Sequence, residues 1–109
     1  MTLLFSKTYF PPNQASKVGK LYIEWLKDNP PDNSIGKTIC IGVTSNEGGD
    51  IMVIGITDIA KGKEKEALML NTRQNLFMTA GIEGFKYKTN IILNFIEAYK
   101  IIGMDAPEV

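Results

Sequence analysis

The spacing of apolar residues in this 109-residue chain changes several times, and the order of these changes constrains the fold more than any other feature. Segments in which apolar and polar residues alternate predict strands, whereas apolar residues at intervals of three or four predict helices. The chain reads as strand, helix, strand, strand, helix, strand and a short closing helix. This order predicts an α+β domain with a four-stranded antiparallel sheet, in which two crossover helices connect the strands.

Prolines and asparagines set the expected boundaries of the first two elements. A strand over residues 2–10 is followed by Pro11 and Pro12, which cannot donate hydrogen bonds to a neighbouring strand. Asn13 is a suitable N-cap for the helix that follows. This helix should end at the segment 29–33, because a residue that precedes proline is disfavoured in helical conformation.

The next two strands, over 35–44 and 51–57, are joined by a hairpin turn at 46–50, whose residues tolerate positive φ. Strict alternation in the first of these strands predicts one apolar face and one face of small residues. The apolar face would hold Ile35, Ile39, Ile41 and Val43, and the small face Gly36, Thr38, Cys40, Gly42 and Thr44. The second of these strands is apolar on both faces, which is typical of a central strand.

The C-terminal half is expected to contain a helix over 63–79 that ends with Gly81 as its cap, followed by a strand over 85–93. Asn94 and Glu97 have the spacing of a capping box, which predicts that a short third helix of about two turns follows. We expect residues 1–104 to form one domain and residues 105–109 to form a C-terminal tail.

Both crossover helices should pack on the same face of the sheet, which leaves the other face uncovered. The strand over 51–57 presents apolar side chains to that uncovered face, through either Val53 or Ile54 and their alternating neighbours. A single copy would therefore expose a large apolar patch. The sequence predicts a homodimer that buries this open sheet face.

Composition indicates the cellular compartment and the classes of partner that the protein should not bind. Lys and Arg together number 12, as do Asp and Glu, so no net charge attracts nucleic acid or acidic lipid. The apolar runs are too short to span a bilayer, and the N-terminus lacks the pattern of a signal peptide. Cys40 is the single cysteine and cannot form an internal disulfide. We expect a cytoplasmic protein that binds neither nucleic acid nor membrane.

The chain contains no histidine, which removes the commonest ligand for transition metals and the commonest general base. The acidic residues do not have the spacing of a calcium-binding loop. Without histidine to activate it, Cys40 is expected to act as a small apolar residue. We therefore expect no metal site and no redox cofactor, and the sequence identifies no catalytic residue.

Four segments carry a resemblance to a known superfamily: Tyr9–Pro12, Pro30–Asp32, Gly81–Tyr87 and Phe95–Gly103. With them, the chain resembles the dimeric α/β-barrel branch of the ferredoxin-like fold, and within it small stand-alone archaeal and bacterial domains of unknown function. The resemblance covers most of the chain, and its motifs are architectural. Better-known members of the superfamily include antibiotic-biosynthesis-type monooxygenases, haem-degrading enzymes and small-molecule isomerases. Their histidine-dependent chemistry does not carry over to a chain without histidine.

Arg73 is the only arginine, and it lies within an apolar stripe that is expected to face the core. Its guanidinium group could extend over apolar surface into water, or pair with an acid such as Asp58 or Glu66. It could instead receive a ligand carboxylate through two parallel hydrogen bonds. The structural roles are favoured over the ligand role. The stripe comprises Met69, Leu70, Leu76, Phe77 and Ala80.

Aromatic side chains complete the candidate ligand site. The helical spacing of Tyr22, Trp25 and Phe77 directs them towards the sheet, where they could line a cavity or fill the core. These residues, with Arg73 and Tyr9, are the candidate ligand-binding residues for a small carboxylate or aromatic molecule. The leading hypothesis is a small-molecule-binding domain or an assembly module. The alternative is a cofactor-independent monooxygenase or isomerase that uses Arg73 with Tyr9 or Tyr22 on a small oxygenated substrate.

Overall fold

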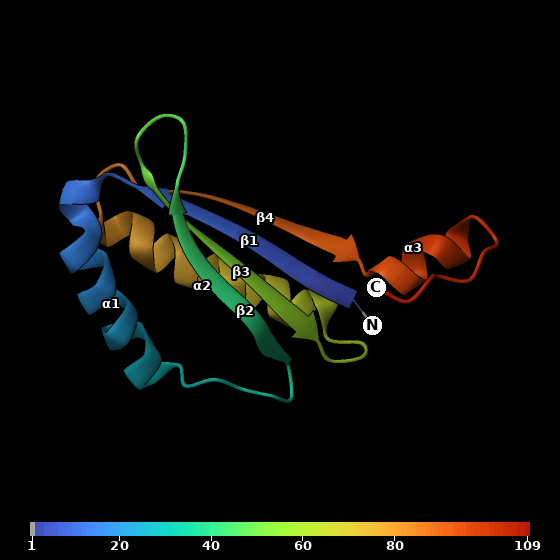
Figure 1. Cartoon of the computed structure of the whole chain (residues 1–109). Helices are drawn as coiled ribbons and strands as arrows, with labels where there is room; N and C mark the ends of the chain where they lie inside the picture. The colour runs from blue at the N-terminus through green and yellow to red at the C-terminus, as the bar shows by residue number, and fades with distance from the viewer. Residues whose placement is uncertain (1) are drawn as a thin grey trace.

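The computed structural model describes residues 2–109, and its elements follow the order expected from the sequence. They comprise β1 (Thr2–Phe10), the 3-10 turn η1 (Pro12–Gln14), α1 (Ala15–Asp28), β2 (Gly36–Ser45), β3 (Ile51–Ile59), α2 (Glu64–Gly81), β4 (Lys86–Leu93) and α3 (Phe95–Ile101). The strands form one antiparallel sheet in the order β2-β3-β1-β4, so that β3 is central, as expected. In Figure 1, α2 runs behind the sheet and α1 diverges from β2, with a long loop between them.

The helix ends differ in part from the expectation. Asn13 lies within η1 and does not cap α1, whose N-cap residue is Gln14. Gly81 is the last residue of α2 and not its left-handed cap. The left-handed conformation is adopted by Gly84 instead, with a φ of +80°. The capping box of α3 is confirmed, because the Glu97 backbone N–H donates to Asn94 Oδ1 at 2.8 Å and the Asn94 backbone N–H donates to Glu97 Oε1.

A bulge in β2 makes the expectation of strict alternation wrong. Thr38 pairs with Thr57 and Cys40 pairs with Ile56, which leaves Ile39 as an extra residue between them. An extra residue shifts all following side chains to the other face. Thr38 therefore faces the helices together with Ile41, and both line the same cavity.

The face of α2 that contacts the sheet is also not the expected apolar stripe. Met69 and Leu76 are 51% and 55% exposed, whereas Ala67, Asn75 and Met78 are buried. Residues 67, 71, 75 and 78 lie on one side of the helix at intervals of three or four. The sheet-facing side of α2 is therefore apolar at both ends and polar in the middle.

The core is divided into two apolar clusters as a result. One contains Leu4, Ile59 and Ala67, near the start of β1 and of α2. The other lies near the ends of the same two elements and contains Phe10, Met78, Ile82 and Phe85. The space between the clusters holds the polar side chains described below.

In the described part of the chain, no helix covers the opposite face of the sheet (Figure 1). Side chains on this open sheet face alternate with the helix-facing residues of each strand. They include Leu3, Phe5, Tyr9, Met52, Ile54, Ile56 and Ile92, all of them half-buried.

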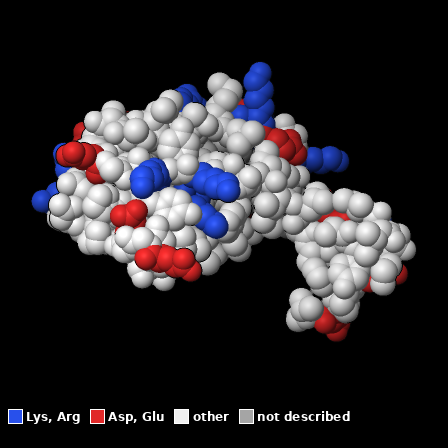
Figure 2. Space-filling view, turned by 90° about the horizontal axis from the view of Figure 1, so that it is seen from above, with Lys and Arg blue, Asp and Glu red and all other residues white. Residues whose placement is uncertain are grey.

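The α3 helix extends beyond the end of β4 and stands apart from the sheet (Figures 1 and 2). Several of its apolar side chains are exposed, including Ile96 at 57% and Ile101 at 70%. The radius of gyration is 15.5 Å, compared with about 13 Å for a compact domain of this length. No helix among residues 2–109 is both long and apolar enough to cross a membrane.

Candidate functional site

The middle of the domain, between the two apolar clusters, is lined by uncharged polar side chains. On β1, Ser6 and Thr8 lie between the core residues Leu4 and Phe10 and share their face of the strand. On α2, three amide side chains lie between Ala67 and Met78 in the same way: Asn71, Gln74 and Asn75. Polar groups therefore face one another from the sheet and from the helix.

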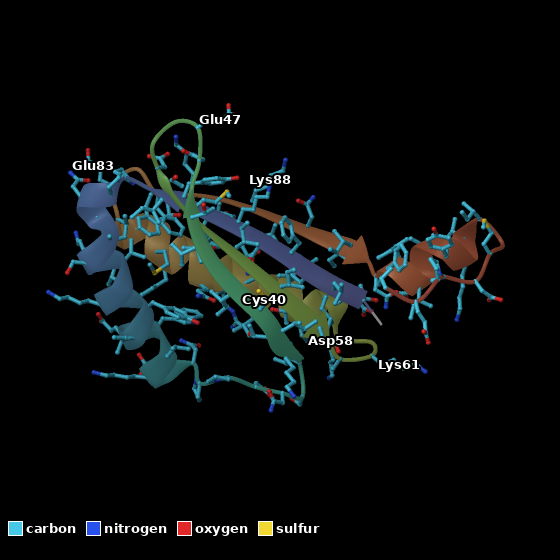
Figure 3. The ribbon with its side chains drawn as sticks, in the orientation of Figure 1. Cys40, Glu47, Asp58, Lys61, Glu83 and Lys88 are labelled. Carbon is cyan, nitrogen blue, oxygen red and sulfur yellow. The ribbon has the colours of Figure 1, made fainter. Side chains whose placement is uncertain are left out.

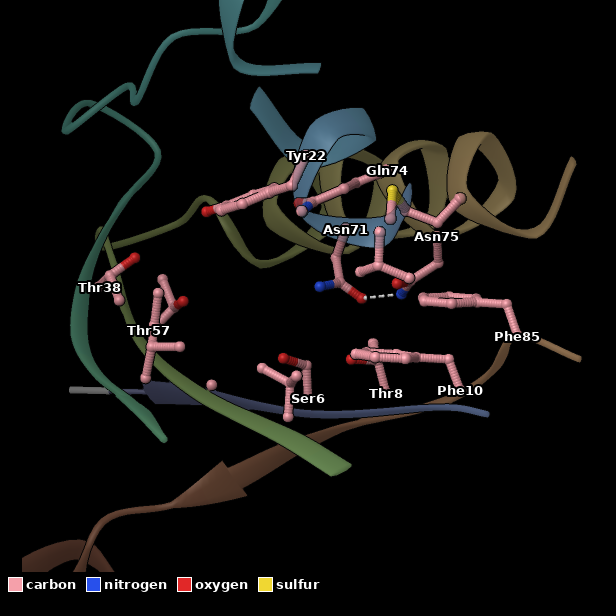
Figure 4. A pocket seen from close by; sticks show the side chains of 16 residues that line it. Ser6, Thr8, Phe10, Tyr22, Thr38, Thr57, Asn71, Gln74, Asn75 and Phe85 are labelled. Carbon is pink, nitrogen blue, oxygen red and sulfur yellow. Dashed lines mark hydrogen bonds between the residues drawn. The ribbon is translucent and has the colours of Figure 1, made fainter. Parts of the chain in front are cut away.

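These groups line a half-open cavity of about 240 Å³ (Figure 4). Its base is formed by the sheet, its roof by α2 and its side by α1. Phe10 and Phe85 close its apolar end, with their rings stacked at 6.5 Å between centroids. Glycines leave room at its surface, since a methyl group added at Gly19 would meet no other atom within 4 Å.

A second hollow of about 370 Å³ continues from this cavity towards the loop between α1 and β2. The two spaces share Tyr22, Thr38, Thr57, Asn71 and Gln74, so we describe them together as the cleft. Its outer part is bordered by Trp25 and by the loop residues from Asn29 to Ile35.

Hydrogen bonds fix two of the amide groups in the roof of the cleft, those of Asn71 and Asn75. Asn71 Oδ1 accepts from Asn75 Nδ2 at 2.9 Å and from Thr89 Oγ1 at 2.6 Å, which joins α2 to β4. Thr79 Oγ1 donates to the Asn75 backbone carbonyl at 2.7 Å. Asn75 is only 3% exposed and is the one buried polar residue among those described. This network holds polar groups in place inside the domain, where an unpaired polar group would be costly.

The inner cavity has no charged side chain in its lining. Charged residues lie instead at the periphery, as Figure 3 shows for Glu47 in the hairpin, Lys61 before α2 and Glu83 after it. Asp32 and Lys37 border only the outer hollow. The pKa of the Asp32 carboxyl lies below its ordinary value, chiefly because the Ser34 hydroxyl and the Ser34 backbone N–H donate to it. The electrostatics of the inner cavity therefore favour an uncharged occupant, because an ion buried there would lack a counter-charge.

Three of the five residues predicted as ligand-binding lie at or behind the cleft. Tyr22 borders both of its parts, and Trp25 borders the outer part. The Phe77 ring packs against Trp25 with 5.5 Å between centroids, and thereby supports the wall formed by α1.

The other two predicted residues lie elsewhere. Arg73 is exposed on α2 and borders neither part of the cleft, because it lies on the outward side of the helix near Met69 and Leu76. Tyr9 alternates with Thr8 and faces the open side of the sheet, beside Lys86 and the β2–β3 hairpin. The structure therefore does not bring Arg73 together with Tyr9 or Tyr22.

Sequence reasoning missed the polar residues of the cleft, although a signal was present. Ser6 and Thr8 occupy positions between apolar residues on one face of a strand, and Asn71 and Asn75 are four residues apart on a helix. This pattern marks a polar section within an otherwise apolar core. Among residues 2–109, no three acidic or cysteine side chains are grouped as metal ligands would be.

Comparisons with known proteins establish the fold. No family model matches the sequence, and no curated protein matches it either. A dimeric ferredoxin-like protein from an uncultured marine organism has a similar structure, with a TM-score of 0.54 and 14% identity, over 85% of this chain and 94% of the other. An antibiotic biosynthesis monooxygenase matches with a TM-score of 0.50 and 13% identity, over 86% and 98% of the two chains.

The C-terminal domain of MgtC from Mycobacterium tuberculosis is also similar, with a TM-score of 0.50 and 9% identity, over 83% of this chain and 88% of that domain. At such identities the likeness concerns architecture alone. The chain thus has a ferredoxin-like α+β fold, as predicted, and a fold of this kind hosts unrelated activities.

Proposed function

We propose that this protein binds a small, uncharged organic molecule in the cleft between its helices and its sheet. The observation that carries the proposal is the polar section that divides the core, with hydroxyl groups on the sheet facing amide groups on α2. A domain of this size would gain stability from an apolar core at these positions, since packed apolar groups are stabilising. Polar groups arranged around a cavity with an apolar end are instead typical of a ligand site.

Size and charge define the class of ligand. An inner volume of about 240 Å³ accommodates a molecule of the size of a single substituted ring. Phe10, Phe85 and Met78 offer apolar contact at one end, and the hydroxyl and amide groups offer hydrogen bonds along the rest. The absence of charge from the lining favours alcohols, ketones and amides over carboxylates and amines.

The test is a set of nuclear magnetic resonance titrations of the isotope-labelled protein with benzyl alcohol, benzoate and benzylamine. We expect benzyl alcohol to shift the resonances of the cleft, and the two ions to shift them less at equal concentration. Gly19→Leu should abolish these shifts by filling the cavity. Lys17→Leu, on an exposed position of the same helix, is the matched control. Shifts that survive Gly19→Leu, or a preference for the ions, would contradict the proposal.

We further propose that the protein is a homodimer in which the open sheet faces of two copies pack together. One copy has an accessible surface of 7482 Å², whereas a compact monomer of this mass exposes about 6,000 Å². The excess of roughly 1,500 Å² exceeds the approximately 800 Å² that each partner buries in an interface of standard size. The half-buried apolar side chains on β1 and β3 supply a surface for a second copy, on which Lys7 lies between Phe5 and Tyr9. The expectation of a cytoplasmic location remains part of this proposal.

A further inference from the structure

The two ends of the Asn71 side-chain amide have different surroundings. Its oxygen accepts two hydrogen bonds, from Asn75 Nδ2 and Thr89 Oγ1, and so uses both of its lone pairs. Its nitrogen donates to no group among residues 2–109. Both N–H groups of Asn71 are therefore available inside the cleft, which Asn71 lines in both of its parts.

The same hydrogen bonds determine which end of the amide faces the cleft. With Asn75 in the orientation that it has in the structure, rotating the Asn71 amide by half a turn would place its nitrogen against Asn75 Nδ2, so that two donors would oppose each other. Asn75 is nearly completely buried and cannot turn away into solvent. In Figure 4 the nitrogen of Asn71 lies on the side away from Asn75 and points into the open centre of the cleft. Asn71 is thus a donor whose direction is set before any ligand binds.

We propose that Asn71 determines the specificity of the cleft by donating a hydrogen bond to an uncharged acceptor oxygen of the ligand, of the kind found in ketones, esters and amides. This inference rests on the proposed function and adds the group that the ligand must carry. A binding site that offers a fixed donor discriminates against an analogue without the acceptor, because the donor is then left unpaired. A carboxylate would also accept the bond, but no cation in the inner lining offsets the cost of burying its charge.

Thr89 and Asn75 act as positioning residues in this arrangement. Thr89 reaches Asn71 from β4, and among residues 2–109 its hydroxyl is the only group outside α2 that holds the Asn71 amide. Thr89→Val removes that bond and nearly preserves the volume of the side chain. We expect it to reduce the preference for acceptor-bearing ligands without abolishing binding, and Thr89→Ser to restore the preference.

The test compares acetophenone with ethylbenzene, which differ only in the carbonyl group. Dissociation constants come from nuclear magnetic resonance titrations of the wild type, Asn71→Leu and Asn90→Leu. Asn90→Leu is the matched control, because Asn90 is exposed and pairs with Phe5 on the open sheet face. We expect the wild type and the control to bind acetophenone about tenfold more tightly, the worth of one neutral hydrogen bond. In Asn71→Leu the ratio of the two constants should fall to near one.

The possible results separate this inference from the proposed function. If both compounds bind the wild type equally, or if the ratio survives Asn71→Leu, Asn71 does not select the ligand, although the cleft still binds it. If neither compound binds while benzyl alcohol does, the carbonyl inference is overturned and the ligand class is restricted to donors. If no uncharged compound shifts the cleft resonances, the proposed function fails as well. Should Asn71→Leu not fold, Asn71→Ala and Thr89→Val provide the same comparison.

Discussion

Gly84, in the left-handed conformation at a φ of +80°, lies directly against the ring of Pro11, so that a Cβ at position 84 would stand 2.9 Å from Pro11 Cγ. This contact joins the segment that leaves β1 to the segment that enters β4. Phe10 precedes Pro11, and Phe85 follows Gly84. Their rings stack on each other and close the apolar end of the cleft. The glycine thus supports the geometry of the candidate site.

Gly84→Ala should destabilise the protein for two reasons. A residue with a Cβ costs about 1–2 kcal/mol in left-handed conformation, and overpacking against a rigid ring adds roughly 1–3 kcal/mol. Gly62→Ala is the matched control, because Gly62 has a φ of +78° but open space around it. We expect thermal unfolding to show a larger fall in Tm for Gly84→Ala than for Gly62→Ala. Equal falls in the two variants would show that the contact with Pro11 has no cost of its own.

The substitution Ile54→Lys tests whether two copies form a dimer through their open sheet faces. Ile54 pairs with Lys7 on the open sheet face, so a lysine there would add a second positive charge beside Lys7 in the proposed interface. Ile23→Lys, at a 59% exposed position of α1, controls for the added charge. We expect analytical ultracentrifugation at micromolar concentrations to show dimers for the wild type and Ile23→Lys, and monomers or insoluble protein for Ile54→Lys. A monomeric wild type across that range would refute the dimer.

The reactivity of Cys40 offers a second measure of the same interface. Cys40 is exposed in a single copy and lies in register with Ile56 on the open sheet face (Figure 3). A partner that covers this face should shield the thiol. Alkylation monitored by mass spectrometry should therefore be faster in a soluble Ile54→Lys variant than in the wild type. The same rate in both proteins would place Cys40 outside the interface.

The turn before β2 should respond to acid. The Ser34 hydroxyl, the Ser34 backbone N–H and the nearby Lys63 favour the charged form of Asp32, which lowers its pKa below the ordinary value of 3.8. A lowered pKa in the folded state stabilises the protein above pH 3.8, and this contribution is lost as the pH falls through the lowered value. Carbon nuclear magnetic resonance of the Asp32 carboxyl should show an upward shift of its pKa in Ser34→Ala. In Ser45→Ala, a control at the far end of β2, the Asp32 pKa should match that of the wild type.

The order of elements could be predicted from the sequence because it depends on local spacing and on turn residues. The segment 46–50 forms the hairpin turn, and Asn94 with Glu97 caps α3, as their local patterns indicated. Strand β3 lies inside the sheet, between β2 and β1, as its apolar residues on both faces indicated. Each of these features is set by a few neighbouring residues.

The cleft could not be predicted because it depends on register and on the orientation of α2. Burial of the most apolar stripe was the natural expectation for α2, yet the structure exposes Met69 and Leu76 and turns Asn71 and Asn75 inward. The bulge at Ile39 similarly brings Thr38 to the helix-facing side, against the alternation of the sequence. Both departures from the apolar pattern place polar groups in the same cavity.

The two glycines within helices should respond in opposite ways to alanine. A methyl group at Gly19 would meet no atom within 4 Å, whereas at Gly81 it would stand 2.6 Å from Leu21 Cδ1. Alanine in a helix interior is about 1 kcal/mol more favourable than glycine, which for a domain of this size raises Tm by roughly 4 °C or more. Gly19→Ala should gain this increment in thermal unfolding. Gly81→Ala should gain less or lose stability, because Leu21 is packed against the apolar cluster at that end of the core. If the two variants gained equally, the close approach of α1 to α2 at Gly81 would not constrain the fold.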